Sequence, residues 1–185
     1  MTKEDKRQKL IEAAYKVFSQ KGFNNTSVKE VAQEAGITPG LVHYYFKSKE
    51  ELLFAVQRDI QSKYHKHYDG EDTSTTEPLE VLKEIKTRVQ NNPDWYRWRY
   101  ELYSLGIKSE SLQREVQSMM KLGRDSLSHP LQSIVKEPKE AEVMASILLA
   151  CFDGLALQKM VDDEFDIDAS YDMLAKLFES YLKKQ

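Results

Sequence analysis

The sequence predicts an all-α protein of about nine helices, and three observations support this fold class. Apolar residues recur at the three- and four-residue spacing of amphipathic helices along most of the 185-residue chain. Only seven Gly and five Pro interrupt this pattern, which leaves little room for a turn-rich β fold. No segment alternates apolar and polar residues over a useful length, so we expect no β-sheet.

The first helix is predicted over residues 6–20. Its apolar residues, which include Leu10, Ala14 and Phe18, fall on one face of a helix with 3.6 residues per turn. Gly22 follows this segment, as expected for a residue that ends a helix in a left-handed backbone conformation.

Two short helices come next, separated by a tight turn. Ser27 and Glu30 have the spacing of a capping box that starts the first of them, and Gly36 ends it. Thr38 is the predicted N-cap of the second, with Pro39 in its first turn, where a missing N–H costs nothing. Two short helices joined by about three residues that include Gly are typical of a helix-turn-helix.

In a helix-turn-helix the second short helix lies in the DNA major groove. Val42 and Phe46, four residues apart, are expected to face the core of the small domain. The remaining arc of this helix is aromatic with polar tips, which suits hydrogen bonds to phosphate oxygens.

A longer helix is predicted over about 49–67, beginning at a capping box formed by Ser48 and Glu51. We expect it to link a helix-turn-helix domain at residues 1–50 with a larger helical domain at residues 51–185. The polar, breaker-rich stretch 69–78 ends it.

The larger domain contains the remaining helices. An amphipathic segment begins near residue 79 and ends near 91–93, and an aromatic-rich stretch covers 94–105. Helical periodicity returns over about 111–135, 139–162 and 169–183.

The charge distribution differs between the two predicted domains. Residues 1–50 hold nine Lys and Arg against six Asp and Glu, whereas residues 51–185 hold eighteen against twenty-four. The basic N-terminal domain is therefore where we expect a polyanion to bind.

We expect a cytoplasmic protein. The single Cys151 suits a reducing compartment, and the charged N-terminus lacks the apolar core of a secretory signal. The longest apolar run, 143–157, is shorter than the roughly 18 to 20 residues of a membrane helix, so no membrane partner is expected.

The sequence contains no catalytic constellation, so we expect no enzyme, no cofactor and no metal site. His65 and His67 lie two residues apart, and on a helix such residues point in different directions. Cys151 lies within the apolar run, which favours an inert packing thiol over a nucleophile.

Residues 8–56 resemble the DNA-binding domain of TetR/AcrR-type bacterial transcriptional regulators. The resemblance rests on the G-F-x-x-T-S boundary at 22–27, the V-A-x-x-A-G segment at 31–36 and the F-x-S-K-E-x-L segment at 46–52. It implies dimeric repressors, less often activators, whose variable C-terminal domain binds a small molecule and thereby releases operator DNA.

The resemblance also implies a set of DNA-binding residues. The first turn of the second short helix, residues 38–41, would approach base edges. Phosphates would be held by Ser27, His43, Tyr45 and, at the start of the next helix, Lys49. For Tyr44, a groove contact and packing against the domain both stay open. His43 stands where the family usually has Tyr, and an imidazole there would make a phosphate contact sensitive to pH. The full set is Ser27, Lys29, Thr38, Pro39, Gly40, Leu41, His43, Tyr44, Tyr45 and Lys49.

The apolar helix at 143–157 is expected to need cover from its own domain and from a partner subunit, as in a four-helix bundle built by two chains. The alternative is that it and the last helix are simply monomer core. The predicted dimer interface is Met144, Leu148, Cys151, Leu155, Leu174, Leu177, Phe178 and Tyr181.

The aromatic-rich stretch is the expected site of a small-molecule effector pocket, because such pockets are mostly apolar with a few placed polar groups. Ordinary core packing is the alternative for each member. The predicted pocket residues are Trp95, Trp98, Arg99, Tyr103, Met119, Met120 and Phe152.

Together these features predict a homodimeric DNA-binding transcriptional regulator, a repressor of palindromic operators that a small-molecule effector releases. Its expected partners are double-stranded operator DNA, a second copy of the chain and the effector. The alternative is a helical small-molecule-binding or scaffolding dimer without specific DNA binding, which would not need a basic first domain.

Overall fold

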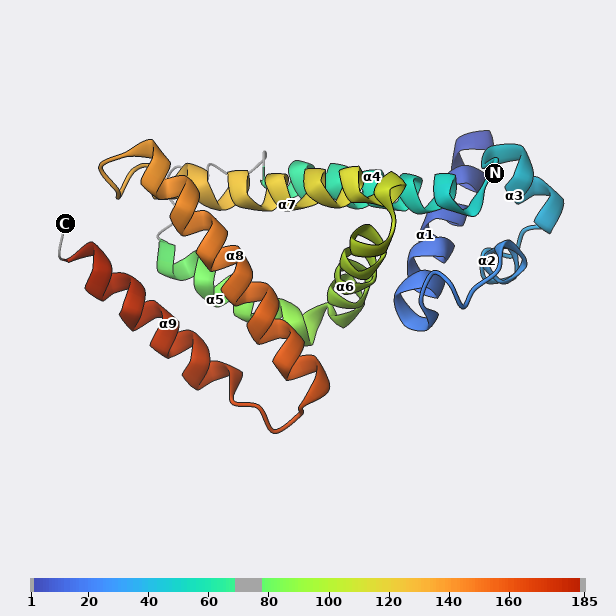
Figure 1. Cartoon of the computed structure of the whole chain (residues 1–185). Helices are drawn as coiled ribbons and strands as arrows, with labels where there is room; N and C mark the ends of the chain where they lie inside the picture. The colour runs from blue at the N-terminus through green and yellow to red at the C-terminus, as the bar shows by residue number, and fades with distance from the viewer. Residues whose placement is uncertain (1, 69–77, 184–185) are drawn as a thin grey trace. The chain divides into compact units, whose positions relative to one another are not determined.

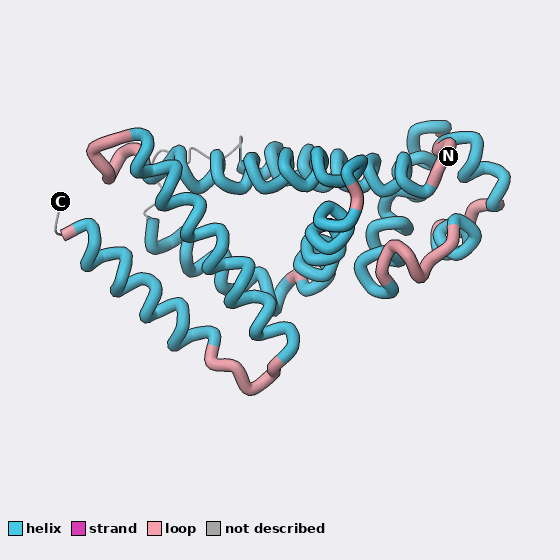
Figure 2. Tube along the Cα trace, in the orientation of Figure 1, coloured by secondary structure: helices cyan, strands magenta, loops and turns pink. Residues whose placement is uncertain are grey.

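The computed structural model describes residues 2–68 and 78–183, with side chains described outside residues 64–84. Within these residues the chain forms nine α-helices joined by turns, and it forms no β-strand (Figure 2). The predicted all-α fold class is therefore confirmed.

The helices follow the chain in the predicted order (Figure 1). The aromatic-rich stretch forms a complete helix of its own, α6, and α7 ends four residues before the predicted end of that segment. The bounds are α1 Lys3–Lys21, α2 Val28–Glu34, α3 Pro39–Tyr45, α4 Lys49–Tyr68, α5 Pro78–Asn91, α6 Pro93–Lys108, α7 Glu110–Leu131, α8 Pro138–Val161 and α9 Ile167–Leu182.

The chain divides into two compact units. The first unit contains residues 1–70 and 97–115, and the second contains 71–96 and 116–185. The division falls inside α6 and inside α7. The domain boundary expected after residue 50 stays a prediction.

Apolar side chains of α1, α2 and α4 form the core of the first unit. Leu10, Val31 and Leu52 are completely buried, as expected for the apolar faces of these helices. From α6, Trp98 joins the same core, where its ring stacks on Phe18 with the ring centroids 6.4 Å apart.

In the second unit, α8 and α9 contact each other and both contact α5. Phe152 on α8 stacks on Tyr171 of α9, with ring centroids 6.0 Å apart and ring planes 9° from parallel. An ion pair of 2.6 Å between Lys86 Nζ and Asp168 Oδ1 joins α5 to α9.

Within the described helices, none is long and apolar enough to cross a membrane.

Candidate nucleic-acid interface

The turn of the helix-turn-helix is set by backbone geometry. Gly36 has a φ of +64°, a left-handed conformation that residues with a side chain seldom adopt. The N–H of Ile37 then donates to the carbonyl oxygen of Ala32 at 2.9 Å, which closes the end of α2. Helix α3 begins at Pro39 with Thr38 as the N-cap residue, although the Thr38 side chain makes no capping hydrogen bond.

Helix α3 buries one edge and exposes the rest. Val42 and Phe46 are buried, as predicted from their spacing. His43 and Tyr44 are exposed, and Leu41 is half-buried. The surface that this helix presents is therefore a mixture of an imidazole, a phenol and one aliphatic side chain.

The start of this helix is open to solvent as well. Thr38, Pro39 and Gly40 are exposed, and a Cβ added at Gly40 would meet no atom within 4 Å. Tyr45 is half-buried, with its ring edge-on to Tyr44 at a centroid distance of 5.1 Å. Another surface can therefore approach the backbone of the first turn closely.

The N-terminus of α2 is fixed by a reciprocal pair of hydrogen bonds. The Ser27 hydroxyl accepts from the Glu30 N–H at 3.2 Å, and the Ser27 N–H donates to the Glu30 carboxylate at 2.8 Å. The ammonium of Lys21, 3.0 Å from Glu30 Oε1, and the Ser27 hydrogen bonds lower the pKa of Glu30 to about 2.

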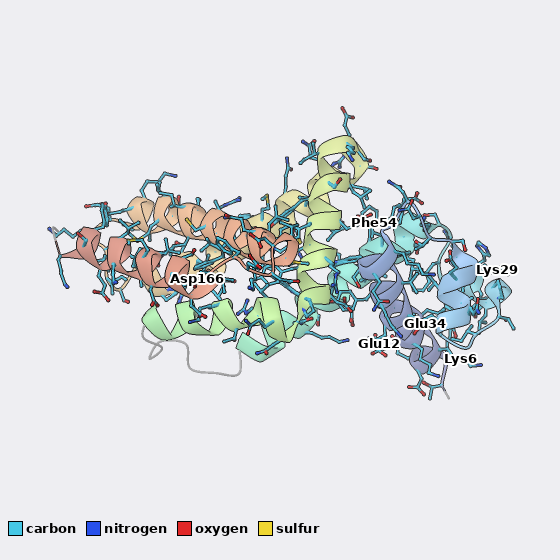
Figure 3. The ribbon with its side chains drawn as sticks, turned by 90° about the horizontal axis from the view of Figure 1, so that it is seen from below. Lys6, Glu12, Lys29, Glu34, Phe54 and Asp166 are labelled. Atoms are coloured by element: carbon cyan, nitrogen blue, oxygen red, sulfur yellow. The ribbon has the colours of Figure 1, made fainter. Side chains whose placement is uncertain are left out.

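Lys29 and Glu34 lie on different sides of α2. Figure 3 shows Lys29 projecting away from α1, whereas Glu34 lies toward α1 and pairs with Lys16 at 2.6 Å. Lys29 is exposed and is therefore available to a phosphate.

The basic first turns of α1 lie against α3. The Lys3 ammonium is 5.1 Å from the centre of the Tyr44 ring, and a hydrogen bond to Tyr44 raises the pKa of Lys3. The Arg7 guanidinium lies 5.3 Å from the centre of the Phe46 ring. Positive charge is thus present beside the exposed face of α3.

The sequence predicts a DNA contact for Lys49, but the ammonium of this residue is directed into the protein and is not free at the surface. Its Nζ donates to the carbonyl oxygen of Thr26 at 2.6 Å and lies 4.3 Å from the centre of the Phe23 ring. Partial burial lowers the pKa of this ammonium. Its described hydrogen bond goes to the loop between α1 and α2.

Comparison with known proteins identifies this arrangement. Residues 10–56 match the model of the family described as bacterial regulatory proteins, tetR family, and this stretch runs from α1 into α4. Residues 10–56 therefore form a helix-turn-helix domain of the TetR family of transcriptional regulators. Members of this family regulate transcription and are not enzymes.

Relatives support the assignment beyond this domain. The transcriptional regulator BetI of Rhizobium meliloti (strain 1021) is 27% identical over 183 residues, which are 96% of this chain and 90% of BetI. The chain spans only 34% of the length of the HTH-type transcriptional regulator HbdR of Aromatoleum sp. (strain CIB), and 53% of the length of the HTH-type transcriptional regulator YuxN of Bacillus subtilis (strain 168).

Two solved structures share the fold at low identity. A transcriptional regulator from Saccharomonospora viridis in complex with choline has a TM-score of 0.74 at 18% identity, covering 96% of this chain and 97% of that one. The multidrug binding protein EbrR complexed with proflavin has a TM-score of 0.65 at 22% identity, and the match covers 93% of this chain and 99% of EbrR.

The residues expected to line an effector pocket in this TetR/AcrR-type chain are divided between the two units. Trp98, Arg99 and Tyr103 belong to the first unit. Trp98 is buried there and donates from Nε1 to Gln57 Oε1 at 3.0 Å, which is a core role. The guanidinium of Arg99 lies over the Tyr103 ring at 5.1 Å. The pocket role of this set stays a prediction.

The other expected pocket residues belong to the second unit. Met119 and Phe152 are buried, while Trp95 and Met120 are half-buried. Close to Phe152 lies a group that the sequence did not single out as a pocket residue. The Tyr171 hydroxyl is buried and has no hydrogen-bond partner among the described atoms. Burial raises the pKa of Tyr171, so this phenol stays protonated.

Of the predicted dimer residues on α8, Met144 and Leu148 are buried within the single chain, and Cys151 and Leu155 are half-buried. On α9, Leu174 and Phe178 are half-buried, whereas Leu177 and Tyr181 are exposed. Their role in an interface stays a prediction. The apolar side chains that α8 exposes are its neighbours on the next face: Val143, Ile147, Leu157 and Val161.

Sequence periodicity groups positions 143, 147, 150, 154, 157 and 161 on one face of α8, since they repeat at helical spacing. The sequence alone cannot distinguish it from the buried face, because α8 is apolar all round.

Among the described side chains, no group of three or more His, Cys, Asp and Glu could hold a metal ion. The side chains of His65 and His67 lie outside those described.

Proposed function

We propose that this protein is a homodimeric repressor that binds a palindromic operator and is released from it by a small-molecule effector. The observation that carries the proposal is the exposed face of α3 within a TetR-family N-terminal domain. Such a helix is the element that a helix-turn-helix inserts into the major groove.

In this proposal the first turn of α3 approaches base edges. Thr38, with its hydroxyl, and Leu41, with an apolar side chain suited to a thymine methyl group, supply the sequence-dependent contacts. Gly40 has no side chain that would hold the backbone away from the groove, and Pro39 presents a compact apolar ring beside it. Base preference then comes from few contacts, so the flanking phosphate contacts must fix the register.

Phosphate contacts come from both sides of α3. Ser27 and Lys29 at the start of α2 bind one strand, and His43, Tyr44 and Tyr45 supply polar tips from α3. The positive charge beside Tyr44 supports this assignment, because it would face a polyanion.

The second copy of the chain is proposed to cover the exposed apolar stripe of α8 and α9. On α8 the stripe comprises Val143, Ile147, Leu157 and Val161, and Ala150 and Gly154 between them are exposed as well. On α9 it comprises Met173, Leu177 and Tyr181. Apolar residues gathered on one face of two adjacent helices are typical of an interface, and small residues at 150 and 154 permit close approach of a partner helix.

The effector is proposed to bind in the second unit. Its aromatic residues, including Phe152 and Tyr171, and its unpartnered Tyr171 hydroxyl suit a small organic molecule with an apolar body and a polar group. The structural neighbours bound to choline and proflavin support such a ligand class and supply the first probes. Binding would favour a conformation in which the two α3 helices no longer match successive turns of major groove.

The decisive experiment is selection of binding sites from randomised duplex DNA by the purified protein at a fixed salt concentration. We expect an enriched palindrome with half-sites about one helical turn apart. Sequence-indifferent binding that only responds to salt would contradict the proposal and favour the small-molecule-binding dimer without specific DNA recognition. Competition between the selected duplex and choline or proflavin then tests the effector part.

A further inference from the structure

A short loop, residues 22–27, joins α1 to α2 (Figure 2), and it ends at Ser27, one of the proposed phosphate contacts. It begins at Gly22, whose φ of +81° turns the chain out of α1. Its geometry, together with the packing of α2 on α1 and the Lys16–Glu34 ion pair, sets how α2 and α3 project from the rest of the first unit.

A carboxylate from far along the chain holds the beginning of this loop. Glu101 Oε1 on α6 accepts a hydrogen bond from the backbone N–H of Phe23 at 2.6 Å. Hydrogen bonds to an ionised acceptor are shorter and stronger than neutral ones. A Cβ at Gly22 would stand 3.4 Å from the same oxygen, an ordinary contact, so the φ of +81° and not a lack of space favours glycine there.

An ammonium holds the end of the same loop. Lys49 Nζ on α4 donates to the Thr26 carbonyl oxygen at 2.6 Å and covers the Phe23 ring. The two charged groups interact, since Glu101 is among the carboxylates that act to raise the pKa of Lys49 against its desolvation. Loop residues 23–26 are thus held from two helices by groups of opposite charge.

The position of Glu101 is itself fixed by the core. Trp98 lies three residues earlier on α6 and therefore on a neighbouring part of the same face. Its indole N–H donates to Gln57 of α4 at 3.0 Å, and its ring packs against Phe18 and Tyr15 of α1. A shift of α6 therefore changes the Glu101 contact with the loop.

We propose that Glu101 is a positioning residue for DNA recognition: it holds the loop between α1 and α2 so that α2 and α3 present their DNA-binding face. This inference rests on the proposed function. It also gives a direct contact by which a change in α6 reaches the loop before α2, in addition to the contacts that α6 makes with α4.

The test measures the affinity of Glu101 variants of the full chain for the selected operator duplex, with the salt dependence of binding and the melting temperature of each variant. Glu101→Ala is expected to weaken binding about tenfold. One charge-assisted hydrogen bond that stabilises the DNA-binding conformation of the loop is then lost, and its free energy is subtracted from that of binding. The salt slope stays unchanged, because no phosphate contact is lost. Glu101→Gln keeps an acceptor oxygen and is expected to bind within about threefold of the unmodified protein.

Charge alone predicts the opposite result, since removal of a carboxylate favours binding to DNA. Glu110→Ala, which removes an exposed carboxylate from the same unit, is the matched control and should bind at least as tightly as the unmodified protein. If Glu101→Ala does not fold, Glu101→Asp replaces it, because the shorter side chain keeps the charge but cannot reach the Phe23 N–H in the same way.

Operator affinity of Glu101→Ala, or of its Asp replacement, at or above that of the unmodified protein would overturn the inference. Equal weakening by Ala and Gln would overturn it too, because the acceptor oxygen would then be irrelevant. Failure of the unmodified protein to select any duplex sequence would instead overturn the proposed function itself.

Discussion

The ammonium of Lys49 is turned into the protein, and this orientation leads to a prediction. Lys49→Ala should weaken binding to all duplex sequences while leaving the salt slope unchanged, because its described hydrogen bond is to Thr26 and not at a free surface. The measurement is operator affinity between low and moderate salt.

Lys29→Ala is the matched comparison, since Lys29 is exposed on α2. It should reduce the magnitude of the salt slope by about 0.9, the value for one phosphate contact. If Lys49→Ala reduces the magnitude of the salt slope by a similar amount, Lys49 contacts a phosphate as the sequence predicts, and the expectation stated here is wrong.

The buried hydroxyl of Tyr171 gives a prediction about stability. Tyr171→Phe removes a polar group that has no described partner, so we expect the free energy of unfolding to rise by about 1 kcal/mol without ligand. Denaturant unfolding measures the change.

Tyr181→Phe provides the control on the same helix, because the Tyr181 hydroxyl donates to Glu140. We expect this substitution to leave stability unchanged or slightly lower. Equal destabilisation by both substitutions would mean that the Tyr171 hydroxyl is satisfied in solution, for example by an ordered water.

The short helix α2 depends on its capping box, and its stability should respond to acid. The pKa of Glu30 is lowered in the folded protein from 4.5 to about 2, so its contribution is complete above pH 4.5 and is lost as pH falls toward 2. Glu30→Gln should therefore melt below the unmodified protein at pH 6, and the difference should shrink progressively below pH 4.5.

Thermal unfolding followed by circular dichroism at several pH values checks this expectation. Glu50→Gln removes the same charge from an exposed position in the first turn of α4 and serves as the control. A difference for Glu30→Gln that is constant with pH would contradict the role of its ionised form.

For the assembled protein, we predict that charged residues on the exposed stripe of α8 and α9 prevent dimerisation. Replacing Ile147 and Leu177 with Asp puts two charges on the proposed interface, and such charges are costly to bury without partners. We expect the double variant to sediment as a single chain and to lose most of its affinity for a palindromic duplex, while the unmodified protein sediments as a dimer.

Ile107→Asp is the control, because Ile107 is an equally apolar side chain that is 85% exposed outside the stripe. It should leave the sedimentation of the protein unchanged. An unmodified protein that sediments as a single chain at micromolar concentration would contradict the proposed dimer.

The sequence determined the fold class, the order of the helices and the helix-turn-helix, because each rests on local signals. Helix ends are set by residues a few positions apart: Ser27 with Glu30, Gly36 and Pro39. The apolar spacing of α1 and α3 determines which face of each helix is buried. The family motifs at residues 10–56 fall within the same local structure.

Only the tertiary structure decided which face of α8 is buried, since a helix that is apolar all round gives no preferred direction. It also assigned Trp98 to the core of the first unit and brought Glu101 and Lys49 to one loop, although 78 residues separate Glu101 from Phe23. Contacts at such separations depend on how whole helices pack, and no local spacing in the sequence encodes them.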